Sequence, residues 1–288
     1  MSERRPLAQA IKTAQERGCP LSEVFLMQEI LEGGLPRASL LGAMEGRLAV
    51  MRSSWTRGLE SPQHSASGLV RGGGHLLGQM ATSGQSLISP SFTRLIAGAM
   101  AIGEVNACMG RIVAAPTAGS CGVLPATLFT CAETRGFSTA QLVLALFTAG
   151  GIGAAIDQLA TLSGAEGGCQ AEVGAASAMA AGALVELCGG GPERVGAAVV
   201  FALSNLLGLV CDPVLGLVEV PCTARNAMGA ANAVLAAEMA LAGVACHFAP
   251  DAVIEVMGKV GRRIPEELRE TARGGLAAIY VPPAADAC

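Results

Sequence analysis

The sequence predicts a single all-α domain in which glycine-rich loops connect buried helices. Hydrophobic residues make up 51% of the 288 residues, charged residues only 15%, and the chain contains 38 glycines. No stretch shows the sustained alternation of apolar and polar residues that marks a half-buried β-strand. A disordered chain would combine low hydrophobicity with high charge, so this composition indicates helices that pack closely through small side chains.

The N-terminal part, to about Leu59, predicts three amphipathic helices. Apolar residues from Leu21 to Leu31 recur at helical spacing, and the glycine pair at 33–34 ends that helix. The apolar pattern resumes after Pro36. A polar, glycine-rich loop follows over residues 60–74, and loops of this length inside a domain are often functional.

The rest of the chain predicts long helices separated by two irregular stretches, 111–122 and 211–221. The helices are expected over about 92–109, 138–162, 171–187, 192–209 and 226–243, with two shorter ones near Asp251 and Pro265. Pro192, after three glycines, is typical of a helix start. No repeat or linker divides the chain, so one domain over 1–288 is expected, with a flexible tail at about 277–288.

Charge and hydropathy argue against two classes of partner. A net charge of −4 leaves no basic footprint for nucleic acid. The apolar stretches 142–156 and 195–210 fall short of the roughly 20 residues that span a bilayer, so both are expected to be buried core helices. The polar N-terminus has no apolar signal region, and we expect a cytoplasmic protein.

Three of the ten cysteines, Cys169, Cys211 and Cys222, stand at predicted helix–loop junctions beside glycine or proline. Iron–sulfur clusters need thiolate ligands and free backbone N–H groups near their sulfur atoms, and irregular backbone leaves such groups free. The chain has no Cys-x-x-Cys pair, so the usual zinc-ribbon spacings are excluded. Disulfides are rare in cytoplasmic proteins, which leaves a metal site assembled from distant cysteines as one interpretation.

Small buried apolar residues are the other interpretation of these cysteines. The cysteines among apolar helical residues are interpreted in that way: Cys108, Cys131, Cys188 and Cys246. A three-thiolate site on a four-iron cluster would leave one iron without a protein ligand. Such an iron acts as a Lewis acid on a substrate oxygen, which fits dehydration of a hydroxy compound better than electron transfer.

A second candidate site is the loop Pro-Thr-Ala-Gly-Ser-Cys-Gly at 116–122, directly before a predicted helix. Gly119 and Gly122 permit turns that aim N–H groups inward, and Thr117 and Ser120 add hydroxyl groups. The N-terminus of a helix attracts negative charge, so the loop suits a small anion such as an amino-acid carboxylate. The alternative is a simple helix cap, and the missing Gly-Lys-Ser/Thr excludes a P-loop.

Five motifs, in order along the chain, closely resemble the iron–sulfur-dependent L-serine dehydratases. They are Ala-Pro-Thr-Ala-Gly-Ser (115–120), Glu-Gly-Gly-Cys-Gln-Ala-Glu-Val-Gly (166–174), Cys-Asp-Pro-Val (211–214), Gly-Leu-Val-Glu-Val-Pro-Cys (216–222) and Arg-Asn-Ala (225–227). The resemblance covers nearly the whole chain. It implies an all-α catalytic domain that converts L-serine to pyruvate and ammonia.

The resemblance also implies which residues do the chemistry. Cys169, Cys211 and Cys222 would hold a [4Fe–4S] cluster, and the C-terminal Cys288 would cap its open iron until substrate arrives. The residues implied in substrate binding are Ser67, Gly68, Thr117, Gly119, Ser120 and Asn226. No pyridoxal phosphate is implied.

The base that removes the α-proton of serine is not readable from the chain. The family's Ser-Ser-His-Thr-type motif is missing, so the chain resembles an alpha subunit that needs a beta subunit, and an oligomer is expected. His64 and His75 flank the Ser67 loop and are the candidates within this chain.

Several residues depart from the family pattern, in the substrate loop, before Arg225 and after Ser120. Val70 and Arg71 stand where Thr and Gly are expected, Ala224 stands where Lys is common, and Cys121 replaces a smaller residue. The alternatives are a lyase acting on threonine or cysteine with the same cluster, a non-catalytic iron–sulfur sensor of oxygen or redox state, and a membrane helical bundle.

Overall fold

The computed structural model describes residues 7–282. Within that range the chain forms thirteen α-helices and no β-strand, so the predicted all-α fold is confirmed. The helices are α1 (Leu7–Arg17), α2 (Leu21–Gly33), α3 (Arg37–Glu60), α4 (Gly73–Thr82), α5 (Pro90–Ala107), α6 (Val123–Arg135), α7 (Thr139–Leu159), α8 (Gly164–Gly167), α9 (Ala175–Leu187), α10 (Pro192–Ser204), α11 (Cys222–Ala242), α12 (Pro250–Gly261) and α13 (Leu276–Ile279). Shorter turns are η1 (Ala118–Ser120), η2 (Gln170–Gly174), η3 (Val214–Gly216) and η4 (Glu266–Leu268).

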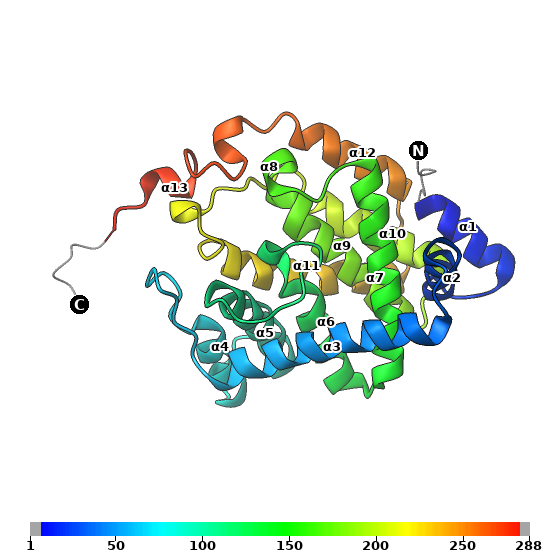
Figure 1. Ribbon diagram of the computed structural model, residues 1–288, viewed down its shortest axis with the longest axis horizontal. Helices are drawn as coiled ribbons and strands as arrows, with labels where there is room; N and C mark the ends of the chain where they lie inside the picture. Colours follow the sequence, from blue (N-terminus) through cyan, green and yellow to red (C-terminus); the bar gives the residue numbers. More distant parts are fainter. Residues whose placement is uncertain (1–6, 283–288) are drawn as a thin grey trace.

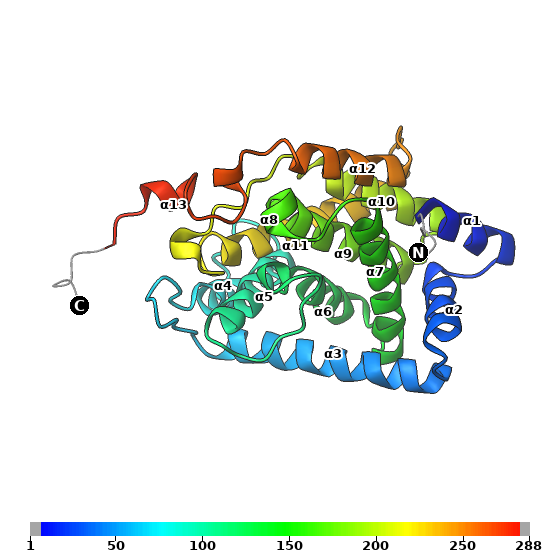
Figure 2. The same ribbon diagram turned by 45° about the horizontal axis from the view of Figure 1, so that its top comes forward.

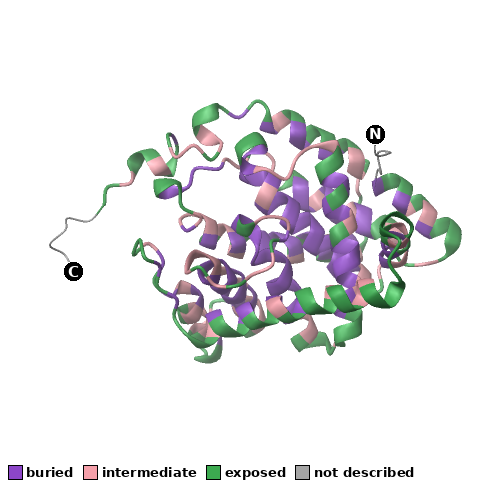
Figure 3. Cartoon of the chain, viewed as in Figure 1, coloured by how far each residue is buried: buried purple, intermediate pink, exposed green. Residues whose placement is uncertain are grey.

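Helix α9 is the centre of the bundle and packs against α6, α7, α10 and α11. Every residue from Ala175 to Val185 is buried, because alanine, glycine and serine on all sides let neighbouring helices approach closely. Buried residues concentrate around this helix in Figure 3. Helix α3 runs along one side of the bundle, and α13 stands away from its body (Figures 1 and 2).

Helix α7 is long and apolar enough to cross a bilayer by length and composition, and it is the one such helix within residues 7–282. Of its most apolar window, 61% is buried inside the fold. Core helices of globular proteins share this composition, and α7 packs directly against α9.

Several elements differ from the sequence prediction, among them α10, which ends at Ser204 where an end near 209 was predicted. The sequence did not predict α4, because it starts at Gly73 and glycine is a weak helix former. Its first N–H groups, of Gly73 and Gly74, donate to the carboxylate of Glu104 on α5 at 2.7 and 3.0 Å. Helix α11 starts at Cys222, four residues earlier than predicted, and the segment near Pro265 is only the single turn η4.

The predicted tail lies partly outside the described residues. Its described part, residues 277–282, includes most of α13. Cys288, the predicted cluster cap, lies outside the described residues.

Candidate functional site

Two helix starts and one loop bring the predicted cluster cysteines together. Cys169 directly precedes η2, Cys211 lies in the loop after α10, and Cys222 is the first residue of α11. The charges of the three thiols would affect one another: Cys169 and Cys222 both act on Cys211, and Cys169 acts on Cys222. Cys169 and Cys211 are each 3% exposed, so this group of cysteines is largely buried.

Burial controls the protonation of these cysteines. It raises the pKa of Cys169 to about 11 and that of Cys222 to about 12. Burial, followed by the neighbouring Glu172 carboxylate, raises the pKa of Cys211 well above its usual range. The guanidinium of Arg225 acts in the opposite sense on Cys169 and Cys222. Cation binding would therefore have to release the thiol protons, as it does at other thiolate sites.

Arg225 and Asp212 form a partly buried ion pair beside the cysteines. The Arg225 Nη2 atom lies 2.8 Å from Asp212 Oδ1, and Nη1 donates to the carbonyl of Val210 at 2.9 Å. Asp212 Oδ2 accepts from the backbone N–H of Leu276, at the start of α13, at 2.8 Å. The pair therefore holds the loop that carries Cys211 against α11.

Glu172 connects the candidate anion loop to the cysteines. Its Oε1 accepts from Thr117 Oγ1 at 2.7 Å, and its Oε2 accepts from Cys211 Sγ at 3.7 Å. A Cβ atom at Gly119 would lie 3.1 Å from Oε1, so a larger residue there would press on this carboxylate. Burial raises the pKa of Glu172.

Asn226 holds the 117–122 loop through hydrogen bonds to its backbone. Its Oδ1 accepts from the N–H of Gly122 at 2.8 Å, and its Nδ2 donates to the carbonyls of Gly119 and Cys222 at 2.8 and 2.9 Å. All of the amide's polar atoms thus bond to backbone, which makes Asn226 a positioning residue for the loop in this structure. Ser120 is fully buried, and its hydroxyl lies 3.3 Å from that of Thr117.

Glu219 connects the Ser67 loop to the cysteines. Its Oε2 accepts from Ser65 Oγ at 2.7 Å and from Ser67 Oγ at 2.5 Å. Glu219 stands three residues before Cys222, so this pair of bonds brings the two loops together. Gly68 at the loop tip has a φ of +76° and is exposed, a conformation that favours glycine.

Comparison with known proteins covers most of the chain. Residues 16–277 match the family described as serine dehydratase alpha chain. The chain is 46% identical over 274 residues to the probable L-serine dehydratase, alpha chain, of Bacillus subtilis, covering 95% of this chain and 91% of that protein.

The chain belongs to the serine dehydratase alpha chain family.

Two further relatives match the chain over different shares of their own length. It is 42% identical over 267 residues to the L-serine dehydratase, alpha chain, of Peptoniphilus asaccharolyticus, covering 93% of this chain and 91% of the relative. It is also 42% identical over 236 residues to the L-serine dehydratase of Streptomyces coelicolor. That match covers 79% of this chain but only 51% of the longer protein.

The two candidate histidines of this alpha chain lie at the ends of the Ser67 loop. His64 is exposed. His75 is half-buried, and both ring nitrogens are engaged: Nδ1 lies 2.7 Å from the carbonyl oxygen of Leu59, and Nε2 lies 3.0 Å from Gln79 Nε2. His64 is therefore the freer of the two.

Glu172, Glu219 and Arg225 are site residues of the alpha chain that the sequence analysis did not select. Each stands inside one of the five motifs, within three residues of a selected residue. The signal that could have found them is a charged residue three positions from a cysteine within an apolar motif, because buried charges require partners. Their partners come from segments far apart in sequence, which no local pattern reveals.

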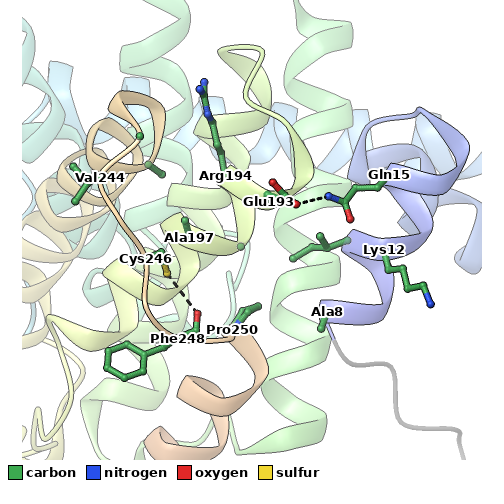
Figure 4. A pocket seen from close by; sticks show the side chains of 14 residues that line it. Ala8, Lys12, Gln15, Glu193, Arg194, Ala197, Val244, Cys246, Phe248 and Pro250 are labelled. Carbon is green, nitrogen blue, oxygen red and sulfur yellow. Dashed lines mark hydrogen bonds between the residues drawn. The ribbon is translucent and has the colours of Figure 1, made fainter.

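A pocket of about 420 Å³ lies away from this site, between α1, α10 and the segment before α12 (Figure 4). Lys12, Gln15, Glu193 and Arg194 line its rim, and Gln15 donates to Glu193 at 2.7 Å. None of the predicted site residues lines this pocket.

Proposed function

We propose that this chain is the cluster-binding alpha subunit of an iron–sulfur-dependent L-serine dehydratase, which converts L-serine to pyruvate and ammonia. The observation that carries the proposal is the convergence of Cys169, Cys211 and Cys222 beside the Thr117–Ser120 loop. Membership of the family, and the names of its relatives, support serine as the substrate.

The donor set fits a [4Fe–4S] cluster held by Cys169, Cys211 and Cys222. Within residues 7–282, no group of three or more His, Cys, Asp or Glu side chains is suited to a single metal ion. When bound, the cluster supplies a Lewis acid that assists departure of the serine hydroxyl group.

The 117–122 loop binds the carboxylate of serine in this proposal. Thr117 and Ser120 supply hydroxyl groups, and the loop leads into the N-terminus of α6, a helix of 13 residues whose dipole attracts an anion. Glu172 and Asn226 hold the loop in place, from the side chain of Thr117 and from the backbone of Gly119.

The Ser67 loop closes the other side of the site, held by Glu219. A base removes the proton from Cα of serine, and loss of the hydroxyl gives aminoacrylate, which water converts to pyruvate and ammonia. His64 is the candidate base within this chain, and a group from the beta subunit is the alternative. The chain has two lysines, Lys12 and Lys259, and both pair with glutamates at exposed positions, which supports a mechanism without pyridoxal phosphate.

A beta subunit completes the enzyme, and the assembly is an oligomer in the cytoplasm. The support for the beta subunit is the length of the Streptomyces coelicolor relative, of which the matched region makes up about half. The relatives named as alpha chains match this chain over nearly their full length.

Anaerobic reconstitution with iron and sulfide tests the proposal. The full chain is expected to gain a broad absorption band that L-serine shifts, and to form pyruvate once the beta subunit is added. Cys169→Ser, Cys211→Ser and Cys222→Ser should each lose the band, whereas Cys246→Ser, at a half-buried position elsewhere, should keep it.

Three results would change the assignment. Failure of the wild-type chain to take up iron and sulfide would remove the cluster. A band that ignores serine, in a chain that forms no pyruvate, would favour a sensor. Faster turnover of threonine or cysteine than of serine would keep the lyase and change its substrate.

A further inference from the structure

Two cysteines outside the candidate site lie together at the opposite end of the bundle. Cys131 is in the last two turns of α6, and Cys188 follows the last residue of α9. Helices α6 and α9 pack against each other. The sequence analysis interpreted both cysteines as buried apolar residues, but each is only half-buried and each lines the same pocket, of about 680 Å³.

The environment of the pair distinguishes the two thiols chemically. The two thiols affect each other's protonation: Cys131 lowers the pKa of Cys188, and Cys188 raises the pKa of Cys131. Arg135, one turn beyond Cys131, further lowers the pKa of Cys188, and Glu238 on α11 acts more weakly in the opposite sense. The thiol with the lower pKa, Cys188, is the more nucleophilic member of the pair. Its neighbour Cys131 is placed to form a disulfide with it once Cys188 is oxidised.

The pocket beside the pair is lined in part by Thr130. Thr130 is 8% exposed, and its Oγ1 has no hydrogen-bond partner among the described residues. A buried hydroxyl without a partner is rare in folded proteins, and it gives a small polar molecule a hydrogen-bonding group one residue from Cys131. The pocket thus gives a small oxidant access to the two thiols and a polar contact beside them.

We propose that Cys131 and Cys188 form a redox-active pair that hydrogen peroxide oxidises to an intramolecular disulfide. The Cys188 sulfur attacks one peroxide oxygen, the O–O bond breaks, and the departing oxygen leaves as water after taking up a proton, which leaves a sulfenic acid. The Cys131 sulfur then attacks the Cys188 sulfur, the S–O bond breaks, and the hydroxide leaves as water with the Cys131 proton. Two thiols are oxidised, and one peroxide is reduced to two waters.

The disulfide would join the far ends of two helices that start at the candidate site. Helix α6 follows the 117–122 loop, and α9 follows Cys169 and Glu172. The bond would therefore fix the relative positions of α6 and α9 without touching the cluster cysteines. This proposal does not depend on the proposed function.

Peptide mapping of the full chain, purified without oxygen and treated with about one equivalent of hydrogen peroxide, tests the pair. We expect a Cys131 peptide linked to a Cys188 peptide, lighter by two hydrogen atoms than the two reduced peptides together. Before oxidation, Cys188 is expected to react with iodoacetamide several-fold faster than Cys246, another half-buried cysteine of this chain. Because the readout is a peptide mass, loss of the cluster cannot imitate it.

Two variants separate the roles within the pair. Cys131→Ser should leave Cys188 as a sulfenic acid that a dimedone probe traps, and Arg135→Gln should slow alkylation of Cys188 several-fold. Alkylation of Cys188 no faster than that of Cys246 would overturn the proposal. Linkage of either cysteine to a different one, or no linked peptide at all, would overturn it equally.

Discussion

At the scale of single residues, two carboxylates, of Glu172 and Glu219, connect the loops of the candidate site. Glu172 bonds to Thr117 and to Cys211, and Glu219 bonds to Ser65 and Ser67. A carboxylate offers two oxygens as acceptors, so one side chain can hold hydroxyl groups from different loops. Hydrogen bonds to charged groups contribute about 1.5–3 kcal/mol, roughly twice a neutral bond, which makes these residues effective anchors.

Glu219→Gln should weaken substrate binding more than it weakens folding. The amide removes the charge that the Ser65 and Ser67 hydroxyls donate to, and the loss of about 1.4 kcal/mol corresponds to a tenfold rise in KM for serine. Steady-state kinetics of the complete enzyme measure the change. Glu45→Gln, at an exposed position on α3, is the matched control and should leave KM unchanged. An unchanged KM in Glu219→Gln would mean that the loop does not contact substrate.

Glu104 predicts a pH dependence of stability. Burial raises the pKa of this carboxyl above its usual value, against the opposing effect of the Gly73 and Gly74 N–H groups and of His64 and His75. The folded chain therefore holds this proton to a higher pH than the unfolded chain does. The protonated form of Glu104 therefore contributes stability at low pH. This contribution is lost as the pH rises from the pKa of Glu104 in the unfolded chain through its pKa in the folded chain.

Urea unfolding in buffers from about pH 4 to about pH 8 compares the wild-type chain with Glu104→Gln. Glu104→Gln keeps one oxygen acceptor for α4 and does not titrate. The urea midpoint of the variant, relative to that of the wild type, should therefore increase as the pH rises. Parallel midpoints across this range would show that Glu104 has the same pKa in the folded and unfolded chain.

Close contact between helices decides packing at the scale of elements. Helix α5 packs against α3, α4, α6 and α11, and glycines stand at several of its contacts. A Cβ atom at Gly98 would lie 1.8 Å from the ring of Trp55 on α3. Trp55 in turn packs edge-on against Phe129 of α6, with ring centroids 5.7 Å apart.

Gly98→Ala should destabilise the chain, because Trp55 has no space to move away from the added methyl group without disturbing Phe129. We expect a loss of about 3 kcal/mol in the free energy of unfolding, measured by denaturant titration. Gly150→Ala is the matched control: Gly150 is exposed within α7, with nothing within 4 Å of an added Cβ atom. There alanine should stabilise the helix by about 0.5–1 kcal/mol. Equal effects at both positions would contradict the packing argument.

Helix direction organises the site at the scale of the whole molecule. Helices α6 and α11 and the η2–α9 segment all begin at the candidate site, next to the 117–122 loop, Cys222 and Cys169. Each helix N-terminus carries partial positive charge and unpaired N–H groups, so their convergence favours thiolates and a bound carboxylate. The buried remainder of these helices forms much of the core, so the site lies at one end of the core helices.

Cluster binding is expected to stabilise the whole molecule. A cluster held by cysteines from three separate segments binds the folded chain and not the unfolded one, so anaerobic reconstitution should raise the unfolding midpoint by at least about 5 °C. Thermal melting followed by circular dichroism measures the shift. Cys222→Ser, treated identically, should melt at the temperature of the chain without a cluster. The same shift in both chains would mean that iron binds elsewhere.

The sequence by itself determined the helical class, most long helices and the motifs around the cysteines. These follow from local periodicity, from glycine and proline at helix ends, and from motif spacing, all of which are properties of short segments. The family also follows from the sequence, because five motifs in order are hard to produce by chance.

Only the tertiary structure decided which residues hold the site together. Asn226 bonds to the 117–122 loop, Glu219 to the Ser67 loop and Glu172 to Thr117, across separations of 55 to 154 residues. The start of α4 likewise depends on Glu104 of another helix. The Cys131–Cys188 pair is adjacent only because α6 and α9 pack together. A buried charge needs a partner to offset its desolvation, and that partner can be any polar residue that the fold brings near. Hydrogen bonds between distant residues therefore produce no pattern in the local sequence.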